Sequence, residues 1–317
     1  MHDKLNIVNI SGGKDSTATL LLAKEQISEK EPMIAVFCDT GHEHPITYEY
    51  VAYLSSRVWP IKTVKADFSE RIATRKRNLE HEGMTYKKWI KEGIPEERIS
   101  EVRNLLVPTG NPWEDLMLLK GRFPDRKNKF CTEELKIKPI TSQVVIPSLD
   151  EYEEVMQWLG ERAEESPSRA KKPKIEEVLS PPELDGLWLY RPILHWTWQE
   201  VFDMHDRHNT EPNPLYALGM GRVGCMPCIN ACKPELFQIS TRFPEIIEKV
   251  LVQEQEVSKV SKTGNSSLFH QSKISSKTPI DITDVAKWAK TKRGGKERNP
   301  EADQPPRKCD SMYGLCE

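Results

Sequence analysis

A short glycine turn near the N-terminus carries residue types that bind phosphate. The hexapeptide Ser11-Gly12-Gly13-Lys14-Asp15-Ser16 follows an apolar run, Leu5–Ile10, and precedes a segment whose leucines have helical spacing. Glycines between a strand and a helix let the backbone approach an anion, which free N–H groups and the helix dipole stabilise. The turn is not a Walker A loop, because Asp15 follows Gly-Lys where that motif has Ser or Thr. We expect all six residues to contact a nucleotide phosphate.

Cationic and acidic side chains elsewhere could complete this site. Lys14, Arg162 and Arg169 have the charge to neutralise phosphate or sulfate oxygens, and arginine suits bidentate contacts. Asp39-Thr40-Gly41 ends a second apolar run, and we expect it beside the nucleotide. Asp15 or Asp39 would hold Mg²⁺ if the substrate is ATP. Solvated surface charge is the alternative for the two arginines.

Seven cysteines suggest metal or redox chemistry rather than disulfides, which are rare in a reducing compartment. Cys-x-x-Cys spacing suits zinc or an iron–sulfur cluster, and a fourth ligand could come from the tail or from Cys131. The candidate ligands are Cys225, Cys228, Cys232 and Cys309. Cys316, in the same tail, is either a ligand or a nucleophile. Unligated cysteines are the alternative.

Cys131 is the first candidate for a reactive thiol. It stands before a helix, with Arg126, Lys127 and Lys129 just upstream. A helix N-terminus and cationic neighbours both lower a thiol pKa, so this pattern predicts a thiolate. A half-buried structural cysteine is the alternative.

Two further groups have a weaker pattern. His42 and His44 follow Asp-Thr-Gly, and a His-x-His pair in a loop is more often polar surface than a metal site. The second group is a set of cations that could follow a nucleic-acid backbone if they share one face. We expect them instead to form a solvated helical surface. The cations concerned are Arg71, Arg75, Lys76, Arg77, Arg122 and those of residues 126–129.

The elements that must position these residues alternate along the chain. Apolar runs predict about five strands, and helical spacing between them indicates a mostly parallel, doubly wound α/β sheet. The expected strands are 5–10, 33–37, 61–64, 155–160 and 187–190, and the expected helices are 17–30, 48–58 and 198–207. Thr197 caps the last of these helices, with Glu200 in its first turn.

We expect two units in the 317 residues. Residues 1–215 form the α/β domain, with a helical excursion at 70–128 and a charged loop or lid at 162–174. Residues 216–317 form a cysteine-rich helical module with a mobile linker at 255–280. The net charge of −2 marks no global nucleic-acid binder, and no apolar run approaches the roughly 20 residues of a membrane helix. We expect a cytoplasmic protein with no membrane contact.

With its strand–loop–helix context, the hexapeptide resembles the signature of the adenine nucleotide alpha-hydrolase superfamily, or PP-loop ATP pyrophosphatases. That superfamily includes the phosphoadenosine phosphosulfate (PAPS) reductases, and the resemblance covers roughly residues 5–232. Further matching segments are Asp39-Thr40-Gly41, Gly160-Glu161-Arg162, Glu165-Ser166, Arg169, Arg191-Pro192-Ile193, Trp196-Thr197, Asn213-Pro214-Leu215-Tyr216 and Gly224-Cys225. The resemblance implies a Rossmann-like fold with the nucleotide at the carboxyl edge of the sheet. Because iron–sulfur clusters recur among thiolating members, it favours a cluster over zinc.

The resemblance has two departures at cysteines. The segment from Cys131 to Lys136 is similar to the Cys-Thr-x-x-Leu-Lys stretch of DNA phosphorothioation enzymes, but it lacks the paired cysteines of assimilatory adenylylsulfate reductases. Their cluster is therefore not carried over. The tail around Cys316 resembles the Glu-Cys-Gly-Leu-His tail of thioredoxin-dependent reductases, in a different residue order.

The resemblance implies a PAPS reductase-family enzyme that binds PAPS or ATP and moves sulfur through Cys131 or Cys316. One chemistry reduces a sulfonucleotide, with a thiol donor such as thioredoxin. The other is an ATP-dependent sulfurtransferase that thiolates nucleic acid, supplied by a cysteine desulfurase. A non-catalytic, redox-sensing nucleotide-binding protein is the third alternative. The substrate, sulfur acceptor, electron donor and oligomeric state stay open.

Overall fold

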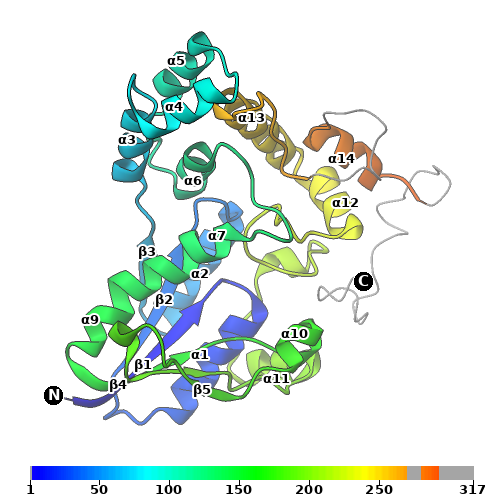
Figure 1. The fold of residues 1–317 in the computed structure, drawn as a ribbon. Coiled ribbons are helices and arrows are strands. Elements are labelled where there is room, and N and C mark those ends of the chain that lie inside the picture. Colours follow the sequence, from blue (N-terminus) through cyan, green and yellow to red (C-terminus); the bar gives the residue numbers. More distant parts are fainter. Residues whose placement is uncertain (1, 270–279, 293–317) are drawn as a thin grey trace.

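The computed structural model describes residues 2–269 and 280–292, and a single mixed sheet forms its base (Figure 1). The strand order is β3-β2-β1-β4-β6-β5, and every pair is parallel except β5–β6. The strands are β1 (His2–Ile10), β2 (Met33–Asp39), β3 (Ile61–Lys65), β4 (Tyr152–Trp158), β5 (Ile175–Glu177) and β6 (Leu187–Tyr190). The predicted α/β class is confirmed. The sheet has one strand more than expected, because the exposed residues of β5 have no apolar pattern.

Alternating side chains of the central strand bury both faces of the sheet. Val8 and Ile10 face α1 (Lys14–Gln26) and α2 (Pro45–Arg57), whereas Leu5 and Ile7 pack on the opposite face. This period of two is the pleat of a strand covered on both sides. On the outside of α1 lies α11 (Trp198–Arg207), which begins at the predicted Thr197 cap with Glu200 completing a capping box.

The opposite face is covered by one helical run that contains two wide π-helical segments. Its parts are α7 (Phe130–Thr132), η1 (Glu133–Ile137), α8 (Lys138–Ile140), η2 (Thr141–Val145) and α9 (Ile146–Leu149). Each wide segment precedes a proline, Pro139 or Pro147, which has no N–H for the helical ladder. The carbonyl of Leu135, four residues before Pro139, accepts a hydrogen bond from Cys38 Sγ at 2.8 Å. A sheet cysteine thereby satisfies a carbonyl of this run.

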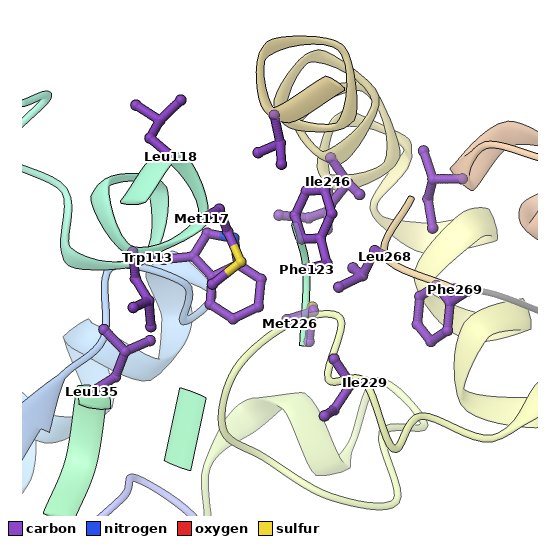
Figure 2. Packing of buried hydrophobic residues seen from close by; sticks show 14 of the residues in the cluster. Trp113, Met117, Leu118, Phe123, Leu135, Met226, Ile229, Ile246, Leu268 and Phe269 are labelled. Atoms are coloured by element: carbon purple, nitrogen blue, oxygen red, sulfur yellow. The ribbon is translucent and has the colours of Figure 1, made fainter. Parts of the chain in front are cut away.

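A second layer of helices stands beyond the carboxyl ends of the strands (Figure 1). Two distant segments of the chain build it together, and one apolar core joins them. Figure 2 shows Trp113, Met117 and Phe123 of the first segment packed with Ile246 and Leu268 of the second. The helices are α3 (Ser69–Asn78), α4 (Met84–Lys91), α5 (Glu96–Leu105), α6 (Pro112–Lys120), α12 (Lys233–Arg242), α13 (Pro244–Val260) and α14 (Ile282–Ala289). None of the helices described is long and apolar enough to cross a membrane.

The prediction of a mobile linker at 255–280 is wrong for its first half. Residues 255–260 are the end of α13, and the following turn is held by the buried carboxylate of Glu254. This carboxylate accepts hydrogen bonds from Ser267 Oγ (3.0 Å), Leu268 N (2.8 Å) and Ile282 N (2.8 Å). Polar groups of this segment therefore take part in a buried hydrogen-bond network, and the amino-acid composition alone does not reveal it. Residues 270–279 lie outside the described part.

Two of the cations considered for a nucleic-acid track are held by partners within the protein. Arg75 donates to the carbonyls of Leu118, Leu119 and Val260, and Arg71 pairs with Glu134. These arginines tie α3 to the rest of the helical layer, so they are occupied structurally.

Glu254 makes the stability of the helical layer depend on pH. Burial raises the pKa of Glu254 from 4.5 to about 7, so the folded chain binds more protons than the unfolded chain in this range. The free energy of unfolding should therefore fall as pH rises from about 4.5 to about 7. Glu254→Gln removes this titration. It also leaves a buried N–H or O–H donor without its acceptor, which should lower the free energy of unfolding by about 1–3 kcal/mol. Urea denaturation across this range measures both effects.

Glu256→Gln is the matched control, since Glu256 is exposed on the same helix and pairs only with Lys259 among the described contacts. Parallel pH profiles for wild type and Glu254→Gln would contradict the assignment.

Candidate nucleotide site and thiol cluster

The phosphate-loop hexapeptide lies where the strand order reverses direction. The chain moves outward from β1 to β3 and then returns to β4 on the other side of β1, so the loops after β1 and β4 face each other. Such a switch point is where open α/β sheets bind ligands. The two loops touch at Gly160, where an added Cβ would lie 2.9 Å from Ser16 N.

Glycine is required inside the loop itself. Gly12 has a φ of +75°, and an added Cβ would lie 2.7 Å from Thr47 Cγ2 on α2. The two serines close the loop from either end, because Ser11 N donates to Ser16 Oγ and the two hydroxyls are 3.1 Å apart. The backbone between them is consequently held as a compact turn before α1.

A buried ion triad links this loop to the one after β4. Asp15 lies between Lys14 Nζ at 2.6 Å and Arg162 Nε at 2.5 Å. Although burial alone would raise the pKa of Asp15, Lys14 and Arg162 hold it below its ordinary value. Arg162 is only 1% exposed, so the alternative of solvated charge is wrong for it. A second carboxylate, that of Glu164, pairs with Arg162 at 2.5 Å, so the two cations at the loop are both held by acidic partners.

Arg169 lies further from the loop than expected. Its guanidinium is partly exposed and pairs with Glu165, whose carboxylate also accepts from Arg162 N at 2.9 Å. In this arrangement Arg169 supports Arg162 indirectly.

The end of β2 builds a second polar group around Glu43, which sequence reasoning did not single out. Its carboxylate accepts from Thr40 Oγ1 at 2.6 Å and from Tyr48 Oη at 3.1 Å. Tyr48 Oη also lies 2.8 Å from Asp39 Oδ1, which accepts from Gly41 N. The available signal was the position of Glu43 two residues after Asp39-Thr40-Gly41.

The two histidines beside Glu43 are buried, which corrects the expectation of a polar surface. His42 stacks on Trp113 with ring centroids 4.0 Å apart, and burial lowers its pKa to about 3. His44 caps α2 by accepting from Ile46 N, and it packs on Phe243. Both histidines therefore join the sheet edge to the helical layer.

Residues 223–228 connect the phosphate loop to this polar group. The carbonyl of Val223 lies 3.3 Å from the position of a Cβ on Gly13, and Cys225 Sγ donates to Glu43 Oε1 at 3.7 Å. Burial raises the pKa of Cys225 to about 12, although the nearby Lys136 ammonium opposes this. The Cys225 thiol is therefore protonated at neutral pH.

Two more thiols belong to the same cluster. Cys228 hydrogen-bonds Arg222 and lies close enough to Cys131 to perturb its titration. The prediction of a lowered Cys131 pKa is wrong. Burial and then Cys228 raise it, whereas Lys136 and hydrogen bonds with Thr132, rather than the exposed cations upstream, act against them. We call Cys131, Cys225 and Cys228 the thiol cluster.

The predicted metal centre is not formed by the described residues. Nowhere in 2–269 and 280–292 do three His, Cys, Asp or Glu side chains converge on a metal-binding position. Cys232 precedes α12 as its N-cap, and Cys309 and Cys316 lie outside the described residues. The ligand set of Cys225, Cys228, Cys232 and Cys309 stays a prediction.

Comparisons with known proteins agree with this architecture at the level of family. An uncharacterized 37.8 kDa protein of Escherichia phage 186 is 42% identical over 335 residues, spanning 99% of this chain and 97% of that protein. The adenosine 5'-phosphosulfate reductase of Anoxybacillus flavithermus is 35% identical over 72 residues, or 22% of this chain and 29% of the reductase. A crystal structure of PAPS reductase from Candida auris covers 69% of this chain and 80% of its own, with 17% identity and a TM-score of 0.39.

The family described as phosphoadenosine phosphosulfate reductase domain matches residues 6–231, from the first strand to the end of the thiol cluster. The matched range contains the phosphate loop, Arg162 and the segment that carries Cys225 and Cys228. The chain therefore belongs to the phosphoadenosine phosphosulfate reductase domain family.

Proposed function

We propose that this protein binds an adenine sulfonucleotide in the phosphate loop and reduces it with cysteine thiols. The observation that carries the proposal is the contact of residues 223–225 with both Gly13 and Glu43, which joins an anion-binding loop to the thiol cluster. The names of similar proteins, adenosine 5'-phosphosulfate reductases, support the same reaction class.

The chemistry assigned to the cluster balances with two thiols. A cysteine thiol first loses its proton to solvent, and the nearby Lys136 ammonium favours the thiolate. The thiolate attacks the sulfur of the sulfonucleotide, the bond from sulfur to the phosphate oxygen breaks, and the nucleotide leaves as the phosphate anion. A second thiol loses its proton to solvent and attacks the resulting S-sulfocysteine, so that a disulfide forms and sulfite departs. An external dithiol of the thioredoxin kind then reduces the disulfide. Lys14 and Arg162 would stabilise the negative charge of the leaving phosphate.

An ATP-dependent sulfurtransferase is the second candidate function. It is favoured by the Cys131-to-Lys136 segment and by the intact Lys14-Asp15-Ser16 of the loop. In that reaction ATP adenylylates an acceptor with loss of pyrophosphate, and sulfur from a cysteine desulfurase displaces AMP. Nucleic acid is the acceptor proposed, and Mg²⁺ would accompany the ATP phosphates.

The two functions predict different preferred ligands. We expect anaerobic protein to bind PAPS or adenosine 5'-phosphosulfate at least about tenfold more tightly than magnesium–ATP, a difference of about 1.4 kcal/mol. Isothermal titration calorimetry with each ligand measures the ratio. Tighter binding of ATP would contradict the reductase function and support the sulfurtransferase function. Binding of a nucleotide without turnover in either assay would favour the redox-sensing alternative.

Gly12→Ala should weaken nucleotide binding at least about tenfold, because a side chain at positive φ and in contact with Thr47 must shift the loop. Gly224→Ala is the control, since an added Cβ there meets nothing within 4 Å. Calorimetric titration of both variants checks the prediction. Equal affinities for the two variants would show that the loop does not hold the nucleotide.

Cys131→Ser should lower turnover by at least about 10³-fold with unchanged nucleotide affinity, as expected for a residue acting only in the chemical step. Cys38→Ser is the matched control, because the Cys38 thiol lies under the helical run and donates to Leu135 O. Sulfite release, or sulfur transfer for the second function, is the readout. Undiminished turnover would remove Cys131 from the mechanism, and the same comparison applies to Cys316.

A further inference from the structure

One side chain from a distant segment completes the wall of the phosphate loop. Tyr216 lies in a short turn, Pro214–Tyr216, and its hydroxyl oxygen accepts a hydrogen bond from Lys14 N at 3.0 Å. The same oxygen is 3.4 Å from the position of a Cβ on Gly13. It therefore lies against the glycine turn, beside the Val223 carbonyl and Ser11 Oγ, which are 3.3 Å and 3.5 Å from the same position.

The surroundings of Tyr216 hold the loop in one orientation. Asn213 Nδ2 donates to Gly12 O at 3.1 Å, and His205 Nε2 lies 2.9 Å from Lys14 O. Because the C=O and N–H of a trans peptide point in opposite directions, fixing Gly12 O toward Asn213 turns Gly13 N–H to the other side. There Gly13 N meets Ser11 Oγ only at the long distance of 3.4 Å.

The phenol of Tyr216 has a proton left to give. Its oxygen is already an acceptor for Lys14 N–H, and no described residue receives a hydrogen bond from it. Burial, followed by the charge of Asp15, raises the pKa of Tyr216 well above its ordinary value, so the phenol stays protonated. The residue as a whole is half-buried, and its hydroxyl is the part that faces Lys14 N and Gly13.

We propose that Tyr216 is a ligand of the nucleotide's anionic group, accepting from Lys14 N–H while donating its own proton to a phosphate or sulfate oxygen above Gly12-Gly13. This inference rests on the proposed function, because it requires a nucleotide in the loop. A neutral donor adds no charge to the site. It places one direction-specific hydrogen bond beside the cations of Lys14 and Arg162, and hydrogen bonds to ionised acceptors are the stronger kind.

Tyr216→Phe tests the ligand role by removing one oxygen. The ring contacts remain available, with Phe202 edge-on at 6.3 Å and Lys14 Nζ 5.9 Å from the ring centroid. Calorimetry should show about 10- to 100-fold weaker binding of PAPS or ATP, whichever wild type prefers, and unchanged binding of adenosine. Circular dichroism checks that the variant is folded.

The control is Tyr86→Phe, which removes a half-buried phenol that hydrogen-bonds Glu96 in the helical layer. A nucleotide affinity of Tyr216→Phe equal to that of Tyr86→Phe would overturn the inference while leaving the proposed function intact. Tighter binding would overturn it as well, since a purely structural phenol blocks Lys14 N–H. Wild-type protein that binds none of these nucleotides would overturn both.

Titration with AMP separates the two sources of the oxyanion. If Tyr216→Phe weakens AMP binding by the same factor as PAPS or ATP binding, the phenol contacts the phosphate next to the ribose. A loss seen only with PAPS or ATP assigns it to the distal sulfate or phosphate. Equal affinities of wild type and variant for all three ligands contradict the proposal.

Discussion

The buried pair of Asp15 and Arg162 is the interaction on which the site depends. A guanidinium that is 1% exposed is tolerated only with a carboxylate and further acceptors around it, because removing an ion from water costs several kcal/mol. Asp15 lies in the first turn of the helix after β1, and Arg162 follows β4, so the pair fixes the two loops at the switch point. The close packing of Gly160 on α1 is possible only in that register.

The helical layer gives the sheet edge its chemistry. Strand ends alone would present Asp39 and the phosphate loop, but the thiols come from residues 225–228 and from the start of the helical run at Cys131. His42 stacked on Trp113 and Met226 packed in the apolar core attach these segments to the edge. The same packing removes the thiols of Cys131 and Cys225 from water, and this burial is the main cause of the raised pKa of each.

Local patterns predicted much of this arrangement. Five strands, the helix after Thr197 and the loop's position all follow from apolar periodicity and turn chemistry, which act over a few residues. The pKa of Cys131, the burial of His42 and the role of Glu43 depend instead on contacts with residues far away in the chain. The turn after α13 seemed flexible because its serines are polar, whereas Glu254 uses them as donors. Such a pairing has no local signature.

The core shared by two distant segments also sets an order of assembly during synthesis. Helices α3–α6 present Trp113, Met117 and Phe123, but their apolar partners on α12 and α13 begin more than a hundred residues later in the chain. A nascent chain that ends before residue 233 therefore has an uncovered apolar face while its sheet strands are already complete. Long-range contacts of this kind slow folding and expose surface that chaperones recognise. The thiol cluster lies at that junction, so its cysteines stay exposed to solvent in the nascent chain until the helical layer closes over them.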